Sequence, residues 1–222
     1  MSEHDAKRLL AQAGVPSLPE RLANSAQEAV EAAETIGYPV VMKICSPVIP
    51  HKTEIGGVLL AVPDGAAVRA GYDLLLSRAT AAGYESAAIE GVLVAPMAPK
   101  GIETILGVNV DPTFGPAVIF GLGGIHVEVL RDSTLRLAPF DEAEAQKMIR
   151  EIRSWPLLEG VRGGKPADTD ALAKALAALS RFAAANADTL VSIDVNPFVV
   201  WEQGKGAAAL DALITFAEPD EI

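Results

Sequence analysis

The chain has 222 residues, of which 50% are hydrophobic and 21% are charged, and its formal net charge is −11. This composition is typical of a globular chain that buries a sizeable core in one or two domains. The negative charge argues against a general nucleic-acid or anionic-membrane surface. It leaves room for a local basic pocket that binds a phosphate ligand.

The first residues and the cysteine count bear on the cellular compartment. Residues 1–5 lack the basic and apolar regions of a signal peptide, and no apolar run reaches the roughly 18 residues that span a bilayer. Cys45 is the only cysteine in the sequence, so no intrachain disulfide can form and a cysteine-based zinc site is not expected. We therefore expect a cytoplasmic chain in which Cys45 is a small buried hydrophobe.

Helix signals dominate the first part of the chain. Predicted helices begin after residues that favour the N-cap position, which are Ser2, Ser25 and Asp64. Gly14 and Gly37 end the first two of these helices, and an apolar strand is expected at 40–44.

Strands and helices alternate through the rest of the chain. Strands are expected at 88–94, 103–108, 117–120, 198–201 and 207–213, with a further apolar run at 189–193. Helices are expected from Asp141 to about Ile152 and from Thr169 or Asp170 onward. This alternation predicts an α/β architecture, and the proline-containing stretch 95–101 is the best candidate for a hinge between two lobes.

Lys43 and His51 are the candidate catalytic or binding residues of the first half. Lys43 lies inside an apolar strand, where an ammonium either meets an anion, such as a phosphate, or extends from the strand edge to water. His51 lies in the Pro- and Gly-rich segment 46–57, whose backbone N–H groups can approach an anion. Its imidazole suits a proton carrier or a phosphorylated nucleophile, and the alternative is a solvated loop histidine.

A glycine-rich segment at 120–128 follows a predicted strand. It contains Gly123 and Gly124 but has neither the Rossmann spacing nor a Walker A lysine. The segment is either a phosphate or partner-contacting loop, or a tight turn. Farther on, Arg131 and Arg136 suit phosphate binding, although most arginines form ion pairs at the protein surface.

Asn196 and Asp211 suggest a metal site. A turn at 202–206 joins the strands 198–201 and 207–213, and such a hairpin folds the second segment back beside the first. The two side chains then meet at one end of the sheet, where hard oxygen ligands suit Mg²⁺. The alternative is that Asn196-Pro197 forms a turn and that Asp211 is a solvated strand residue.

In chain order, these segments resemble the ATP-grasp subunit of ADP-forming acyl-CoA synthetases, the acetate:CoA ligase (ADP-forming) family. The layout is also similar, more distantly, to the succinyl-CoA synthetase β subunit. The resemblance covers nearly the whole chain and is carried by segments 36–43, 46–58, 103–107, 111–116, 120–128, 136–139, 156–160 and 194–197.

The resemblance implies an ATP-grasp fold, in which two α/β lobes enclose a nucleotide site. It assigns residues 21–95 to one lobe, and 1–20 with 96–222 to the other. It implies ATP or ADP as the nucleotide, with Mg²⁺ held by Asn196 and Asp211. The implied catalytic residues are His51, as a second phosphoryl carrier, and Glu128, and the implied cofactor-binding residues are Lys43, Glu103, Gly123, Gly124 and Arg136.

The family reaction is acyl-CoA + ADP + phosphate ⇌ acid + ATP + CoA, and a histidine of the CoA-binding α subunit or domain carries the phosphoryl group. Because nothing in the sequence resembles a CoA site, the resemblance implies a hetero-oligomer in which the partner handles the small-molecule acid, CoA and phosphate. A nucleotide-sensing regulatory module and a one-chain carboxylate–amine ligase are the alternatives. The hinge, Val94-Ala95-Pro96, lacks the polar residue common in the family, which leaves the nucleotide preference open.

Overall fold

The computed structural model describes residues 1–49, 51–123, 132–161 and 163–217. The chain divides into two compact units, Met1–Asp5 with Leu18–Ala98 and Ala6–Ser17 with Pro99–Ile222. The sequence had assigned 1–20 as a whole to the second of these. Residues 1–5 and 18–20 instead group with the first unit, as do 96–98, and in this unit His4 lies 3.0 Å from the carboxylate of Glu20.

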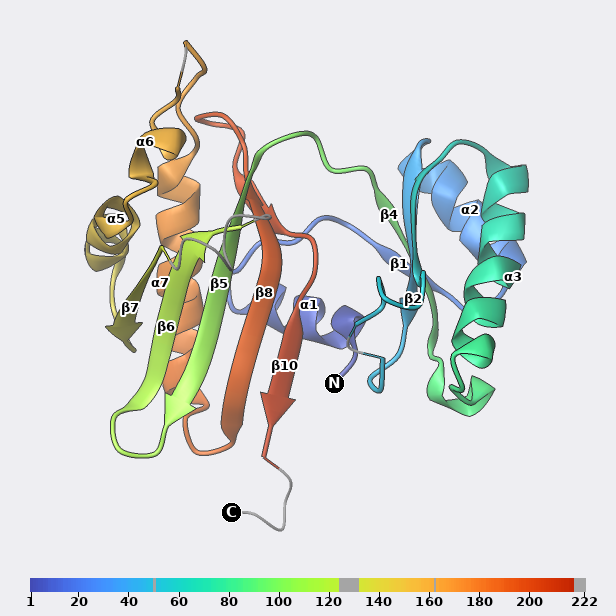
Figure 1. Ribbon diagram of the computed structural model, residues 1–222, viewed down its shortest axis with the longest axis horizontal. Coiled ribbons are helices and arrows are strands. Elements are labelled where there is room, and N and C mark those ends of the chain that lie inside the picture. The colour runs from blue at the N-terminus through green and yellow to red at the C-terminus, as the bar shows by residue number, and fades with distance from the viewer. Residues whose placement is uncertain (50, 124–131, 162, 218–222) are drawn as a thin grey trace. The chain divides into compact units, whose positions relative to one another are not determined.

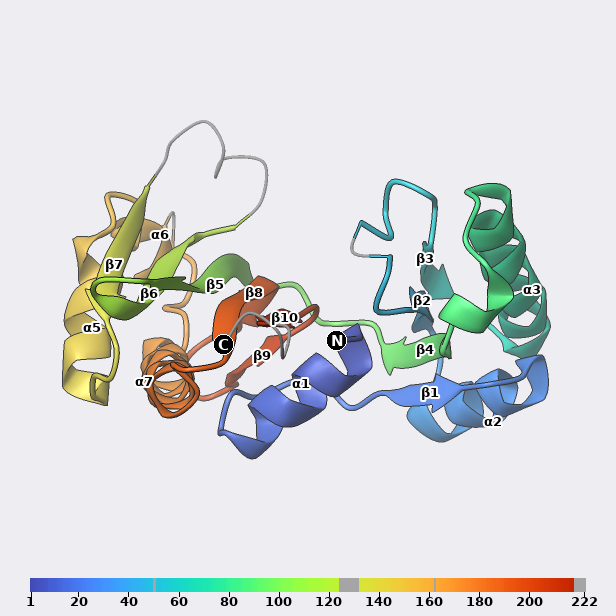
Figure 2. The ribbon, with the colours of Figure 1, turned by 90° about the horizontal axis from the view of Figure 1, so that it is seen from below.

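The first unit is an antiparallel four-stranded sheet with two helices on one face (Figures 1 and 2). Its strands, in spatial order, are β1 (Arg21–Ala23), β4 (Gly91–Pro96), β2 (Val40–Cys45) and β3 (Val58–Val62). The helices are α2 (Ala26–Ile36) and α3 (Gly65–Ala81), which enclose an apolar core with the sheet. Cys45 is fully buried in β2, and this burial raises the pKa of its thiol to about 11, as expected for a residue that serves as a small hydrophobe.

The predicted caps form as the sequence indicated. The Ser25 hydroxyl accepts the N–H of Glu28 at 3.2 Å, and the Asp64 carboxylate accepts the N–H of Ala67 at 2.8 Å. Each cap satisfies an amide that has no partner within its helix. Gly37 ends α2 with a φ of 92°, a conformation that glycine adopts without steric cost.

The strand predicted at 88–94 begins later than expected. A short 3₁₀ helix, η1 (Ser86–Ala88), precedes it, and β4 starts only at Gly91. Gly91 has a φ of 147°, and its backbone passes so close to Ala23 that an added Cβ atom would lie 2.5 Å from that carbonyl oxygen. The close approach of β1 to β4 therefore sets the strand start, which hydrophobic spacing alone did not show.

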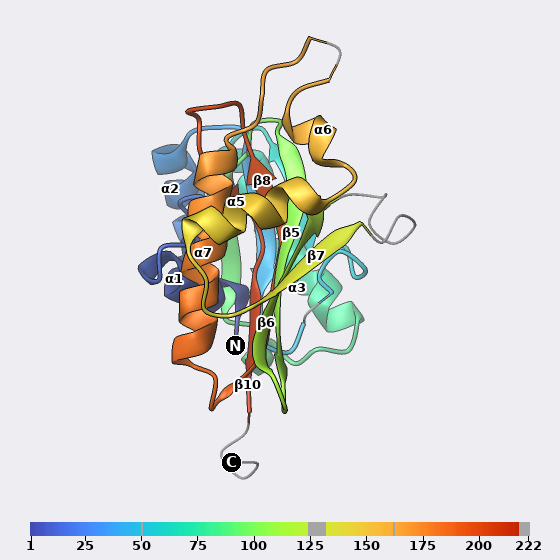
Figure 3. The same ribbon diagram turned by 90° about the vertical axis from the view of Figure 1, so that its left-hand side faces the viewer.

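The second unit is a larger antiparallel sheet, with helices α5 and α7 on the same face (Figure 3). Its strands are β10 (Leu213–Phe216), β8 (Leu190–Val200), β5 (Ile102–Asp111), β6 (Gly115–Leu122) and β7 (Ser133–Leu137) in spatial order, and β9 (Ala207–Ala209) also pairs with β8. Its helices are α5 (Glu142–Glu151), α6 (Trp155–Leu158), α7 (Thr169–Ala185) and the part of α1 (Glu3–Gln12) that follows Asp5. No helix in the described ranges is long and apolar enough to cross a membrane.

Residues 190–200 form one continuous strand, whereas two separate segments were expected at 189–193 and 198–201. β8 runs through Pro197 because the sheet has an irregularity there: Thr104 pairs with Phe198 and Leu106 pairs with Val195. Two residues of β8 therefore oppose one residue of β5, which is the arrangement of a β-bulge and a position where proline is tolerated. The buried Thr104 hydroxyl donates to the Phe198 carbonyl oxygen at 2.8 Å and fixes the strands beside the bulge.

We predict that Gly91→Ala lowers the free energy of unfolding by about 2–4 kcal/mol, because the new Cβ atom meets backbone that cannot move aside. Gly83→Ala is the matched control, since Gly83 also has a positive φ, of 90°, but has no atom within 4 Å of the added Cβ. Its expected cost is the backbone strain alone, about 1 kcal/mol. Urea unfolding of both variants measures the difference, and equal losses would contradict the steric explanation.

Candidate functional site

Lys43 extends from β2 to a carboxylate of the same unit. Its Nζ atom lies 2.8 Å from Oε1 of Glu3, and the Nζ atom of Lys52 forms an ion pair with Oε2 of the same side chain. Glu3 and Lys52 are buried, with 3% and 7% of their surface exposed. Because a charged group removed from water needs a partner of opposite charge, the shared carboxylate offsets the cost of burying both lysines.

The turn that carries His51 is fastened to β2 through Gly57. The N–H of Gly57 donates to the carbonyl oxygen of Lys52 at 2.7 Å, and the Gly57 carbonyl oxygen accepts the N–H of Ile44 at 2.9 Å. A Cβ atom on Gly57 would lie 2.9 Å from both Ile44 and the Lys52 carbonyl oxygen, so the turn needs glycine here. Lys52 is buried and His51 is exposed. The turn is therefore anchored through Lys52 and leaves the His51 imidazole accessible.

In the second unit, the strand register brings Asn196 and Asp211 together. Phe198 pairs with Ala209 on one side and Asp194 pairs with Leu213 on the other, and both pairings share one register that places Asn196 opposite Asp211. Between them, the N–H of Leu210 donates to the carbonyl oxygen of Pro197 at 2.9 Å. The hairpin predicted from the sequence therefore forms, and its β9–β10 connection carries Asp211.

Asp194 joins this pair, although the sequence motifs did not indicate a role for it. It lies two residues before Asn196 in β8, so both side chains project from the same face of the sheet. Asp194 is exposed, but neighbouring atoms displace part of the water around its carboxyl group, which raises its pKa, and the negative charge of Asp211 raises it further. Asp194 and Asn196 are two residues apart, and this spacing would have placed both side chains on one face of a strand. The signal was missed because a break between two strand segments was expected at these residues.

The chemistry of these side chains fits Mg²⁺. Asn196, Asp211 and Asp194 offer oxygen atoms only, which are the ligands that Mg²⁺ prefers. In the described part of the chain, no group of three or more His, Cys, Asp or Glu residues is placed to hold a metal. A site with few protein ligands suits Mg²⁺, which keeps several waters and takes the remaining ligands from substrate phosphates.

Glu103 and Gly123 also lie together. Gly123, which follows β6, donates its N–H to the carbonyl oxygen of Glu103 at 2.7 Å. A Cβ atom on Gly123 would lie 3.0 Å from the Glu103 backbone, so this contact favours glycine. Gly124 and Glu128, the other predicted residues of this segment, lie outside the described residues.

Arg136 is not brought to the face that carries Asp194. Its Nε donates to Oε1 of Glu144 at 2.8 Å, and its Nη2 pairs with Glu151; both acids belong to α5. In the sheet, Arg136 pairs with Val118, whose buried side chain lies on the helix-covered face. The hydrogen bonds that the guanidinium donates to Glu144 and Glu151 raise its pKa. Arg136 therefore joins β7 to α5, and only the sheet register reveals this.

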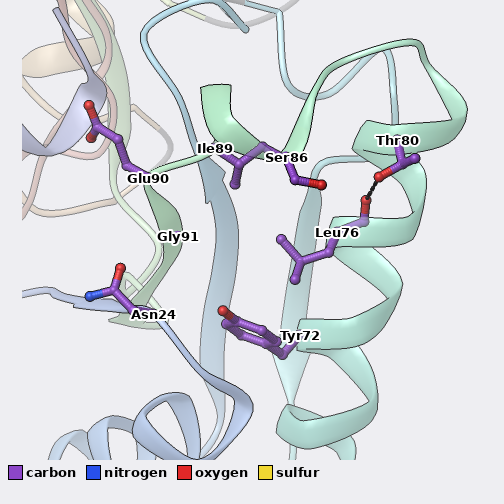
Figure 4. A pocket seen from close by; sticks show the side chains of 8 residues that line it. All are labelled: Asn24, Tyr72, Leu76, Thr80, Ser86, Ile89, Glu90 and Gly91. Carbon is purple, nitrogen blue, oxygen red and sulfur yellow. Dashed lines mark hydrogen bonds between the residues drawn. The ribbon is translucent and has the colours of Figure 1, made fainter.

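A cavity of about 210 Å³ lies elsewhere in the first unit (Figure 4). It is lined by Asn24, Tyr72, Leu76, Thr80, Ser86, Ile89, Glu90 and Gly91. The Thr80 hydroxyl donates to the Leu76 carbonyl oxygen at 3.0 Å, so this polar group is used within α3. The lining includes none of the residues predicted from the sequence, and the cavity is not part of the candidate site.

A family profile described as "ATP-grasp domain" matches residues 1–216. The chain belongs to the ATP-grasp family. The predicted ATP-grasp fold of α/β class is thereby confirmed, and each unit contributes a sheet with helices on one face.

Several members of this family are closely similar to the chain. Subunit beta of acetate–CoA ligase (ADP-forming) II from Pyrococcus furiosus is 42% identical over 96% of this chain and 90% of its own length. A 4-hydroxybutyrate–CoA ligase (ADP-forming) from Nitrosopumilus maritimus is 41% identical, but the chain spans only 30% of its length. Among solved structures, the dinucleotide-forming acetyl-coenzyme A synthetase 1 of Ca. Korarchaeum cryptofilum, in complex with coenzyme A, Ca-AMPCP and HgCl⁺, superposes with a TM-score of 0.91 at 39% identity. That match covers 98% of this chain and 93% of the other.

We predict that Asp194→Asn raises the melting temperature of the metal-free chain at pH 7.5 by about 1–3 °C. The folded-state pKa of Asp194 is raised, so ionising it opposes folding, and this penalty is present above the folded-state pKa and disappears as the pH falls through it. Scanning calorimetry at pH 7.5 and at lower pH, down through the folded-state pKa of Asp194, measures the gain in melting temperature and its loss. Asp188→Asn, at an exposed position in the same unit, is the control. A lower melting temperature for Asp194→Asn would contradict the claim that the ionised Asp194 carboxylate destabilises the folded chain.

Proposed function

We propose that the chain is the nucleotide-binding subunit of an ADP-forming acyl-CoA synthetase, which transfers a phosphoryl group between a phosphohistidine of its partner and ADP. The observation that carries this proposal is the extent of the similarity to subunit beta of the Pyrococcus furiosus ligase, which reaches 96% of this chain and 90% of that subunit. The similarity to subunit beta of the isoenzyme I, at 40% identity over 95% of the chain, supports the same assignment.

The second unit supplies the proposed Mg²⁺ ligands. Asn196 and Asp211 lie opposite each other in one register, and their oxygen atoms hold the metal, with Asp194 beside them. Bound Mg²⁺ neutralises charge on the nucleotide phosphates. Asp194 and Asp211 fix this negative region beside the middle of β8 before any ligand arrives, so the site does not have to reorganise when the nucleotide binds.

The first unit supplies Lys43 and His51. The Lys43 ammonium contacts the nucleotide phosphates, and the exposed His51 imidazole is the second phosphoryl carrier. In the first transfer, a ring nitrogen of His51 forms a bond to phosphorus as the P–N bond of the partner's phosphohistidine breaks. In the second, a terminal oxygen of ADP forms the new P–O bond as the P–N bond to His51 breaks. Fixed positive charge and correct positioning carry most of the catalysis in such transfers.

The partner supplies the acyl and CoA chemistry in this proposal. Named relatives are beta subunits, which implies a second subunit. The Ca. Korarchaeum cryptofilum synthetase has been solved with coenzyme A and Mg-AMPPCP, with a phosphohistidine segment pointing towards the nucleotide binding site. By analogy, we infer that a CoA-binding α subunit or domain presents its phosphohistidine to this chain, and that the acid, CoA and phosphate bind to the partner.

The metal assignment predicts that Asp211→Ala and Asn196→Ala each weaken Mg·ADP binding by about tenfold or more, since each removes an oxygen ligand. Calorimetric titration of the chain measures the affinity. Asp188→Ala is the matched control, because it removes an exposed aspartate of the same unit without touching the site. Unchanged Mg·ADP affinity in both site variants would refute the metal site.

The phosphoryl-carrier assignment predicts that His51→Ala, assayed with the partner, reduces ATP formation from acyl-CoA to below about a hundredth of the unmodified rate. ADP affinity should stay unchanged, because the imidazole is needed only for transfer. His4→Ala is the control, since His4 pairs with Glu20 in the same unit and has no proposed role in transfer. Activity of His51→Ala within a few-fold of the unmodified complex would show that the transfer bypasses this residue.

A further inference from the structure

One carboxylate holds two lysines that play different parts in the first unit. Oε1 of Glu3 binds the Lys43 ammonium, and Oε2 binds the Lys52 ammonium. The side chains of Glu3, Lys52 and Lys43 are 1%, 7% and 14% exposed. At this degree of burial the charges are weakly screened, and the ion pairs hold their geometry far better than surface pairs do.

The two lysines connect Glu3 to both proposed functional elements of this unit. Lys43 is the proposed nucleotide lysine in β2, and Lys52 follows His51 directly in the turn. Lys52 is also held through its backbone, because its carbonyl oxygen accepts the N–H of Gly57. The side-chain contact to Glu3 and the backbone contact to Gly57 therefore both help to place the turn relative to β2, and Arg78 Nη1 also donates to the Gly56 carbonyl oxygen at 2.7 Å.

Building on the proposed function, we propose that Glu3 is a positioning residue for phosphoryl transfer, which sets the placement of the Lys43 ammonium relative to the His51 turn. A lysine side chain has several rotatable bonds, and two neighbouring ammonium groups repel each other. Without the carboxylate, Lys43 and Lys52 would each lose the ion pair that holds its ammonium group beside the other. Glu3 acts through these two residues and needs no contact with the substrate.

Glu3 itself is well suited to hold a fixed position. It is the first residue of α1, where a negative charge is favoured by the helix dipole. The preceding Ser2 is buried, and its hydroxyl accepts the N–H of Asp5 at 3.4 Å, which caps the same turn. The carboxylate is therefore attached to an ordered helix end.

The test is Glu3→Gln in the complex with the partner, which keeps the size of the side chain and removes its charge. We expect kcat for ATP formation to fall by about tenfold to a hundredfold, the loss typical of a misplaced reacting group. We expect the KM for ADP to change by less than about threefold, because removing a nearby negative charge favours the nucleotide while loss of positioning disfavours it.

Further variants separate positioning from a general loss of stability. Lys52→Met should reproduce the fall in kcat, and Lys52→Arg should recover most of it by keeping the positive charge. Combining Glu3→Gln with Lys52→Met should cost little more than either change alone, because both break the same contact. Glu20→Gln is the matched control, since it removes a buried carboxylate from the pair with His4 in the same unit. It should leave kcat unchanged.

A kcat of the Glu3→Gln complex within twofold of the unmodified value would overturn the inference. ADP binding that tightens tenfold without loss of kcat would also overturn it, because Glu3 would then act as an anion that competes with the nucleotide. Rates are referred to the folded fraction measured by calorimetry, and Lys52→Arg and Lys52→Met decide the question if Glu3→Gln does not fold. An unmodified complex that forms no ATP would instead contradict the proposed function on which the inference rests.

Discussion

The proposed chemistry of the second unit depends on one strand register. β8 pairs with β9 and with β10 in the same register, although residues 210–212 separate β9 from β10. Because side chains alternate between the two faces of a sheet, a slip of one residue would turn Asn196 and Asp194 towards the helices. The β-bulge at Asn196 and Pro197 is tied by the buried hydroxyl of Thr104, and this contact helps to keep the register.

The charged side chains that gather in the two units are of opposite sign. The first places Lys43 and Lys52 on the buried carboxylate of Glu3, while the second brings Asp211 beside Asp194 in the middle of β8. Loss of hydration, and then the negative charge of Asp211, raise the pKa of Asp194, so part of this shift comes from repulsion between the two carboxylates. Such stored repulsion is typical of a site that awaits a cation. The net charge of −11 therefore says little about what the chain binds locally.

Much of the fold could be predicted because its signals are local. The caps at Ser25 and Asp64 act within one turn of their helices, and Gly37 ends a helix through its own backbone. The juxtaposition of Asn196 and Asp211 was also accessible, since a short hairpin leaves few alternative registers. By contrast, Arg136 faces α5 because of pairings across the sheet, and Glu3 meets Lys43 and Lys52 only after distant segments pack. No local pattern carries that information.

The central claim is that this chain provides the nucleotide half of an acyl-CoA synthetase. The most direct measurement is ATP formation from ADP and phosphate, with a panel of acyl-CoA thioesters, by the complex that purifies through a tag on this chain. The account predicts ATP formation by the complex with at least one thioester, and none by the 222-residue chain alone. Acyl-CoA-dependent ATP formation by the isolated chain, or none by a complex that contains a CoA-binding partner, would contradict it.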